Sequence, residues 1–317
     1  FHVKKHLVMG AGWYGCHVAK RLKHAGIQVD VYDPNGIMNG SSMRNQNRLH
    51  LGFHYPRSNE TIRECMIGYE RFISEYGAVV EPTRSYYIIA HDSLTSYAKF
   101  TSTFAGTTCE TTEPVALNFD KIQGSVIQTR EMVINPWKAC EMFKAELSSS
   151  YINKIDSVYE KIIDCTYGHM IPRDDFVYET CIVGVIRLRV KCESFGITVM
   201  DGPYFSIYPY DHSNNLYTLT HVVLTPFHRS SAPGRVEVTR AEGRRIVSAM
   251  EKTARGFITN YDDLFEYVTF FTSTKTKIPN QNDDRSLCCT RHGDRIQSYM
   301  GGKITGVFGI DLKDFSS

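Results

Sequence analysis

The chain has 317 residues, of which 42% are hydrophobic and 22% are charged, a balance typical of a globular protein with a sizeable core and two domains. Its formal net charge of +2 gives no broad electrostatic reason to expect nucleic acid or an anionic membrane surface as a partner. No apolar run approaches the length of a membrane span.

Nine cysteines are scattered along the chain without a Cys-x-x-Cys pair, and no secretory leader is evident ahead of them. This usage is typical of a reducing compartment, so we expect a cytoplasmic protein. The adjacent Cys288 and Cys289 can be redox active, but buried or idle thiols are commoner, and we assign them no role. Because the chain begins with Phe1, its register can start inside a longer gene product.

Residues 4–33 contain the parts of a dinucleotide-binding unit in chain order. Residues 4–9 predict a short strand, a Gly-x-Gly-x-x-Gly motif follows, and a helical pattern comes next, closed by Gly26. Residues 27–32 predict the second strand. The motif consists of Gly10, Gly12 and Gly15, with Trp13 and Tyr14 between them as further expected cofactor contacts.

Each part of this unit has a physical purpose. Gly10 makes the tight turn, Gly12 lets the backbone approach a pyrophosphate, and Gly15 lets helix and strand pack closely. Asp33, at the end of the second strand, is placed to accept hydrogen bonds from an adenosine ribose. The motif predicts a dinucleotide site but does not choose between NAD and FAD, which bind to the same unit.

The stretch SSMRNQNRLHLGFHYPRSNE, residues 41–60, is rich in polar and aromatic side chains and lacks the period of a helix or strand. In order, it contains Ser42, Asn45, Leu49, His50, Gly52 and Tyr55, and a Cys-x-x-Gly follows at 65–68. It resembles the segment after the dinucleotide unit in FAD-dependent oxidoreductases of the D-amino-acid oxidase and glycine oxidase (DAO) family, nearest the 2-hydroxyglutarate dehydrogenase-like branch. The run Arg-Leu-His-x-Gly-Phe-His-Tyr-Pro-Arg also resembles uncharacterised oxidoreductases.

Later segments follow the order of the same family. Residues 162–168 resemble the strand that returns to the nucleotide sheet, and 201–210 and 216–227 resemble antiparallel strands of the substrate domain. Residues 283–286 and 296–308 resemble the closing flavin-site loop and last helix. The sequence departs from the family at Asp33, where glutamate is usual, in a short middle segment, and in an early end after Phe308.

The resemblance implies an α/β fold in which a Rossmann-like FAD-binding domain is interleaved with an antiparallel-sheet α+β substrate domain. The FAD-binding domain is expected to comprise residues 1–78, 130–172 and 276–317. Residues 79–129 and 173–275 are expected to form the substrate domain.

The resemblance also assigns roles in cofactor binding. Ser42, Asn45 and the backbone around Leu49 are expected to hold ribityl and pyrophosphate oxygens, and Arg44 or Arg48 to neutralise phosphate. The turn containing Thr166 and Gly168 is expected near the cofactor. The turn formed by Gly301, Gly302 and Lys303 is expected to place backbone amides and a positive charge near the flavin pyrimidine, although a surface turn with a solvated lysine is the alternative.

His50 is expected to contact the flavin without a covalent bond; a structural role ranks second and a covalent bond last. His54, Tyr55 and Arg57 either point at the flavin ring or cap the helix expected near residues 58–76. We name His50, His54, Arg285 and Lys303 as candidate catalytic residues.

Substrate contacts are expected from Tyr55, Tyr208 and His221, although aromatic residues that alternate along a strand more often pack in the sheet. Arg285 can grip an anionic group, or it can pair with a neighbouring aspartate.

The function implied is FAD-dependent oxidation of a CH–OH or CH–NH group in a small polar, anionic substrate. Hydride passes to the flavin and electrons leave to oxygen or another acceptor, with no metal. Two alternatives stay open: a flavin- or nucleotide-binding protein without turnover in a structural or interaction role, and an NAD-dependent dehydrogenase, which leaves residues 41–60 unexplained.

Overall fold

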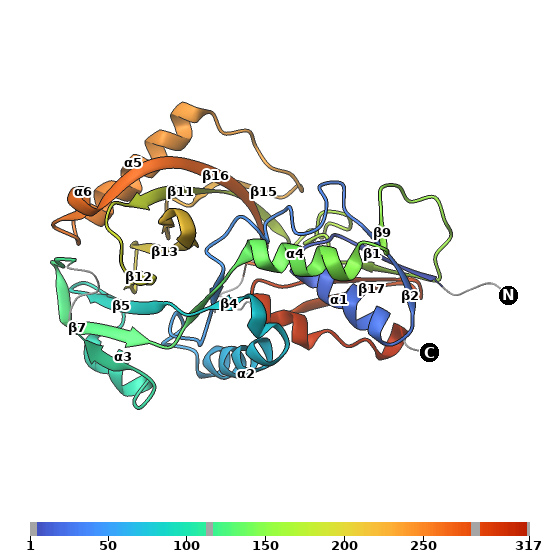
Figure 1. Ribbon diagram of the computed structural model, residues 1–317, viewed down its shortest axis with the longest axis horizontal. Helices are drawn as coiled ribbons and strands as arrows, with labels where there is room; N and C mark the ends of the chain where they lie inside the picture. The colour runs from blue at the N-terminus through green and yellow to red at the C-terminus, as the bar shows by residue number, and fades with distance from the viewer. Residues whose placement is uncertain (1–4, 112–116, 280–285, 316–317) are drawn as a thin grey trace.

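The structure is a computed structural model and describes residues 5–111, 117–279 and 286–315. It contains two large sheets that lie side by side, with a small third sheet between them (Figure 1). Two buried hydrophobic clusters accompany the two large sheets. The predicted α/β class, with parallel and antiparallel sheets, is confirmed.

The first sheet has six strands in the order β17-β18-β10-β1-β2-β9. They are β1 (Lys5–Met9), β2 (Gln28–Tyr32), β9 (Tyr151–Ile152), β10 (Lys161–Asp164), β17 (Cys288–His292) and β18 (Ile296–Met300). Every neighbouring pair is parallel except β17 with β18. As predicted, the segment near residue 162 returns to this sheet, where β10 lies beside β1.

Two helices cover the first sheet (Figure 1). Helix α1 (Trp13–His24) joins β1 to β2 and buries its small apolar face, and Gly26 follows it with a φ of +78°, as a glycine cap requires. Helix α4 (Pro136–Leu147) begins at the Asn135 side chain, which accepts from the amides of its first turn. The Trp13 and Phe143 rings pack edge to face with their centroids 5.1 Å apart.

The second sheet has nine strands in the order β15-β11-β14-β13-β12-β5-β7-β6, and β16 also pairs with β11. They are β5 (Arg84–Ala90), β6 (Cys109–Thr111), β7 (Ile122–Thr129), β11 (Val177–Leu188), β12 (Phe195–Met200), β13 (Phe205–Asp211), β14 (Leu216–His221), β15 (Pro226–Ser230) and β16 (Phe265–Lys277). Its helices are α3 (Tyr97–Thr103), α5 (Arg240–Arg255) and α6 (Tyr261–Leu264). Helix α5 lies against β11, β14 and β16 (Figure 1).

The third sheet joins three short strands, β3 (Arg48–Leu49), β8 (Met132–Ile134) and β4 (Val80–Glu81). Strand β8 lies in the middle and is antiparallel to both neighbours. Helix α2 (Asn59–Tyr76) begins at Ser58, whose side chain accepts from the Thr61 amide. The short 3-10 helices are η1 (Gly77–Val79), η2 (His212–Asn214), η3 (Ile304–Gly309) and η4 (Lys313–Phe315).

The prediction of a last α-helix within residues 296–308 is wrong. Strand β18 occupies residues 296–300, and the 3-10 helix η3 follows it. The segment contains Gly301, Gly302 and Gly306, and glycine costs about 1 kcal/mol relative to alanine inside an α-helix. Among the described helices, none combines the length and apolar character that a bilayer span requires.

Candidate active site

The glycine motif forms a closely packed turn between β1 and α1. Gly10 has a φ of +87°, and a Cβ there would lie 2.5 Å from the carbonyl oxygen of Cys165. A Cβ at Gly15 would overlap the carbonyl oxygen of Gly10. Both positions therefore accept only glycine, and the absence of side chains lets the backbone at the start of α1 approach a phosphate closely.

Asp33 and Ser42 lie beside this turn. The Asp33 carboxylate accepts from the Ala11 amide at 2.8 Å, and the Ser42 hydroxyl accepts from the Trp13 amide at 3.0 Å. Asn45 donates to the Ser41 carbonyl at 2.7 Å and so orders the loop that follows β2. The loop is thereby tied to the glycine turn.

Tyr14 links the glycine turn to the C-terminal loop. Its hydroxyl donates to the Lys303 carbonyl at 2.7 Å, and a Cβ at Gly301 would overlap that hydroxyl. The Lys303 ammonium lies 3.5 Å from the Glu64 carboxylate and 5.3 Å from the centre of the Tyr55 ring. Burial raises the pKa of Tyr14 far above its ordinary value, which keeps this phenol protonated as a donor.

One cavity of about 2110 Å³ connects the glycine turn with the nine-stranded sheet. Its volume exceeds the ~300–1,000 Å³ of ordinary small-molecule pockets, so it has room for a dinucleotide together with a substrate. The predicted site residues on its wall are Gly10, Gly12, Trp13, Tyr14, Asp33, Ser42, Arg44, Asn45, Arg48, His50, His54, Tyr55, Thr166, His221, Gly301, Gly302 and Lys303.

The other predicted positions lie elsewhere. Gly15, Leu49, Gly168 and Tyr208 are packed behind the cavity wall, and Arg285 lies outside the described residues. Among the wall residues, His221 Nδ1 accepts from the amides of Val223 and Leu224 and so holds its own turn. The Tyr208 ring lies under the guanidinium of Arg48.

Arg48 is the most deeply buried cation on the cavity wall. Its guanidinium lies 4.0 Å from the centre of the Tyr208 ring, which belongs to β13 of the nine-stranded sheet. Nη1 donates to the Tyr87 hydroxyl at 3.0 Å and lies 3.2 Å from His54 Nδ1. Nε and Nη2 are buried and have no hydrogen-bond partner among the described residues.

Glu131 balances the charge of Arg48 and was missed by sequence reasoning. Its carboxylate is fully buried, lies 3.8 Å from Arg48 Nη1, and accepts from the Tyr87 hydroxyl at 2.7 Å. Burial alone would raise its pKa, but His50, Arg48 and the Leu51 amide outweigh burial and lower it. Glu131 is therefore ionised at neutral pH.

The two cavity histidines lie against this pair. The His50 and His54 ring centroids are 5.0 Å apart. Burial, and then the charges of Arg48 and His50, lower the pKa of His54 well below its ordinary value, so His54 is neutral. Burial also raises the pKa of Tyr87 well above its ordinary value. Within the described residues, no three metal-ligating side chains gather.

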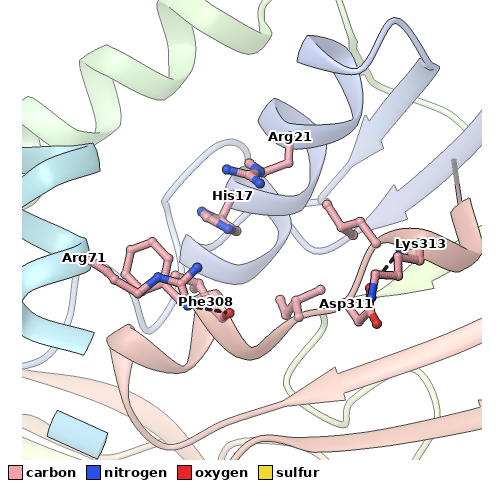
Figure 2. Close-up of a pocket in the computed structure, with 9 residues that line it drawn as sticks. His17, Arg21, Arg71, Phe308, Asp311 and Lys313 are labelled. Carbon is pink, nitrogen blue, oxygen red and sulfur yellow. Dashed lines mark hydrogen bonds between the residues drawn. The ribbon is translucent and has the colours of Figure 1, made fainter. Parts of the chain in front are cut away.

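A second, smaller cavity of about 450 Å³ shares no residue with the first. Figure 2 shows His17 and Arg21 of α1, Arg71 of α2, and the segment from Phe308 to Lys313 around it. His17 is buried, and its Nδ1 lies 2.6 Å from the Tyr76 hydroxyl. This cavity lacks the glycine turn and is not the candidate active site.

Because of His17, the free energy of unfolding should depend on pH. Burial lowers the pKa of His17 to about 4. The Glu75 carboxylate acts in the opposite direction, and the positive charges of Arg21, Lys20 and Arg71 lower the pKa further. Between pH ~6.5 and ~4 the unfolded chain binds a proton here that the folded chain does not, so stability falls as the pH falls. We expect His17 to account for a loss on the order of 2 to 3 kcal/mol across this window.

Chemical denaturation at a series of pH values measures this loss. The variant His17→Gln should lose less stability than the wild type between pH ~6.5 and ~4. Equal losses in both proteins would contradict the assignment.

Comparison with known proteins agrees with this geometry. Residues 5–150 match the family described as FAD dependent oxidoreductase, DAO. The FAD-dependent monooxygenase FPY4 of Fusarium mangiferae is 28% identical, with 95% of this chain and 87% of that protein covered.

Solved structures share the fold. Glycine oxidase from Geobacillus kaustophilus has a TM-score of 0.68 at 10% identity, covering 99% of this chain and 92% of its own. L-alpha-glycerophosphate oxidase from Mycoplasma pneumoniae, solved with FAD bound, has a TM-score of 0.71 at 13% identity, covering 97% and 92%. The 2-hydroxyglutarate dehydrogenase-like branch stays a prediction. Residues 5–150 therefore belong to the DAO family of FAD-dependent oxidoreductases, and the protein is a flavoenzyme whose cofactor is FAD.

Proposed function

We propose that the protein oxidises a CH–OH or CH–NH group of a small anionic substrate by hydride transfer to FAD. The observation that carries this proposal is the free edge of Arg48, formed by Nε and Nη2. A buried donor left without a partner costs about 1–3 kcal/mol, and two parallel N–H groups fit the two oxygens of a carboxylate.

Two other cations on the cavity wall have acidic partners. Lys303 lies 3.5 Å from Glu64, and Arg57 lies 3.2 Å from Asp201. Arg48 also has a nearby acid in Glu131, but only Nη1 faces it. The free edge of Arg48 is thus a better anchor for an anionic substrate than Lys303 or Arg57.

The residues present fit FAD. The glycine turn would receive the pyrophosphate, Asp33 the adenosine ribose, and Ser42 and Tyr14 keep the surrounding loops in place. The bound flavin supplies the hydride acceptor. Arg48 would orient the substrate, and His50, on the cavity wall and 28% exposed, would accept the proton from its OH or NH group.

The assignment of residue ranges to an FAD-binding domain and a substrate domain is also part of the proposal. The six-stranded sheet takes its strands from residues 5–32, 151–164 and 288–300, which supports FAD-binding segments at 1–78, 130–172 and 276–317. Segments 79–129 and 173–275 would form the substrate domain. The eight cysteines whose side chains are described are free, which supports a reducing, cytoplasmic location.

A second candidate is oxygen insertion, because FPY4 is named a monooxygenase. Such a reaction needs a source of electrons, and the sequence has no second glycine motif for a nicotinamide nucleotide. We therefore place oxidation first, with oxygen or another compound as the electron acceptor.

The test begins with the visible spectrum of the purified protein, followed by anaerobic addition of 2-hydroxy and 2-amino acids. The flavin should bleach with one or more of these acids and not with the matching amides, which lack the carboxylate. Under air, oxidation yields hydrogen peroxide and the dehydrogenated product, whereas oxygen insertion places ¹⁸O from labelled oxygen in the product. A colourless protein that binds NAD and gains nothing from FAD would contradict the proposal.

A further inference from the structure

The large cavity meets solvent beside three large apolar side chains. Leu94 is 72% exposed, Val222 67% and Val223 60%. Leu94 and Val222 also line the cavity, so they lie where its wall reaches the surface, and Val223 extends the same patch. We call these three residues the apolar rim. Exposed apolar side chains are ordinary when they are scattered singly, whereas a group beside a cavity is typical of a surface that contacts a ligand.

Hydrogen bonds hold Leu94 in its exposed position. The Leu94 amide donates to the Asp201 carbonyl at 2.9 Å, and the Asp201 amide donates to the Ser93 hydroxyl at 2.8 Å. The Asp201 carboxylate accepts from the Thr95 hydroxyl at 2.9 Å and lies 3.2 Å from Arg57. The charge beside the rim therefore has its partners, and a fixed backbone presents the Leu94 side chain.

The same segment of chain holds the other side of the rim. The Val222 amide donates to the Tyr204 carbonyl at 2.9 Å, and the Val223 amide donates to His221 Nδ1 at 3.1 Å. Both sides of the apolar rim are thus attached at or next to residues 201–204. Because this backbone is already ordered, covering the rim with a ligand costs little further ordering.

The wall of one cavity joins the rim to Arg48. Strand β13 begins at Phe205 and carries Tyr208, whose ring lies 4.0 Å from the Arg48 guanidinium. Phe205 and, on the neighbouring strand β12, Val199 belong to this wall. The stretch from Tyr204 to Tyr208 spans about 13 Å at the rise of an extended strand. A ligand anchored at Arg48 must therefore be extended to reach the rim.

We infer that the substrate is amphipathic: its anionic group binds to the free edge of Arg48, and an apolar tail follows β13 to the apolar rim. The inference rests on the proposed function and deepens it by naming the substrate class, a carboxylic acid with an apolar tail. An extended chain of about ten carbon atoms covers the distance. A protein bound to the rim would instead cover the edge of the cavity through which substrate enters.

Saturated carboxylates from butanoate to dodecanoate test the tail without turnover, because they carry no OH or NH group to oxidise. Calorimetric titration of the holoenzyme measures their dissociation constants. Each added methylene should tighten binding by up to about fourfold, and the gain should continue to about decanoate. A dissociation constant that is independent of chain length would overturn the inference, and so would the absence of binding by every acid.

The double variant Leu94→Ser, Val222→Ser provides the second arm. Serine should be tolerated because both side chains are exposed. Decanoate should bind on the order of tenfold more weakly than to the wild type, and butanoate should bind equally. The matched control is Val158→Ser, which replaces an exposed valine outside the cavity wall. Equal affinities for decanoate in the double variant and the control would contradict the role of the rim.

Turnover distinguishes this inference from the proposed function. If affinity rises with chain length but no 2-hydroxy or 2-amino acid of these lengths bleaches the flavin, the tail is supported and the oxidation is contradicted. Bleaching by short acids together with a flat affinity series gives the reverse result. If the double variant changes the oligomeric state and not the dependence on chain length, the rim is a contact between proteins, which overturns the inference.

Discussion

The variant Gly15→Val is expected to purify without flavin colour. A side chain at this position would overlap the Gly10 carbonyl oxygen, and Gly10 cannot move aside because its amide donates to the Tyr32 carbonyl at 2.8 Å. Overpacking costs about 1–3 kcal/mol even where the surroundings are flexible side chains, and every 1.4 kcal/mol is about a factor of ten in affinity. We therefore expect FAD to bind about 10²-fold or more weakly.

Flavin absorbance per protein and a fluorescence titration with FAD measure this effect. Gly77→Ala is the matched control, because a Cβ there meets nothing within 4 Å, and it should keep its colour. Circular dichroism distinguishes loss of the site from loss of the fold, with Gly15→Ala as the milder variant. Wild-type affinity in Gly15→Val would contradict the placement of the pyrophosphate at this turn.

The variant Arg48→Met is expected to keep FAD and lose turnover. Methionine replaces much of the buried volume, but Tyr87 and His54 lose their donor and Glu131 loses its counter-charge. Truncating one partner of a buried charge pair costs about 2–5 kcal/mol, so kcat/KM for the anionic substrate should fall about 10²- to 10³-fold. Arg48→Lys keeps a positive charge but lacks the pair of parallel N–H groups that can bind both oxygens of a carboxylate. It should therefore recover only part of the lost kcat/KM.

Steady-state kinetics and the flavin content of each variant provide the comparison. Arg71→Met is the control, since Arg71 likewise covers an aromatic ring, with its guanidinium 4.7 Å from the centre of Phe308, but lines only the smaller cavity. If Arg48→Met loses FAD rather than turnover, Arg48 serves the phosphate, as the sequence suggested. Unchanged kinetics would remove Arg48 from the substrate site.

The dinucleotide unit could be predicted because its information is local. The glycines, the helix and the strand that ends before Asp33 lie within a single short segment. At each glycine of the motif, a steric requirement explains why that residue is needed. Residues 296–308 could not be predicted in the same way. Their strand is determined by pairing with β10, whose residues lie more than a hundred positions earlier, and glycine weakens the helical alternative.

Glu131 illustrates a different limit. Its partners Leu51 and Tyr87 are separated from it by 80 and 44 positions, so no spacing or motif connects them. In the sequence it is one glutamate before a short apolar run. His50, by contrast, could be selected because it lies inside a segment that resembles a family pattern.

The small third sheet has a mechanical consequence. Strand β3 arrives directly from the loop tied to the glycine turn, and β8 continues from β7 of the large antiparallel sheet and leads into α4. A rotation of one half of the molecule against the other would therefore bend the pairing between these strands or break it. Since Arg48 lies in β3 and Glu131 directly precedes β8, this buried ion pair would move less than the more distant walls of the cavity in such a rotation.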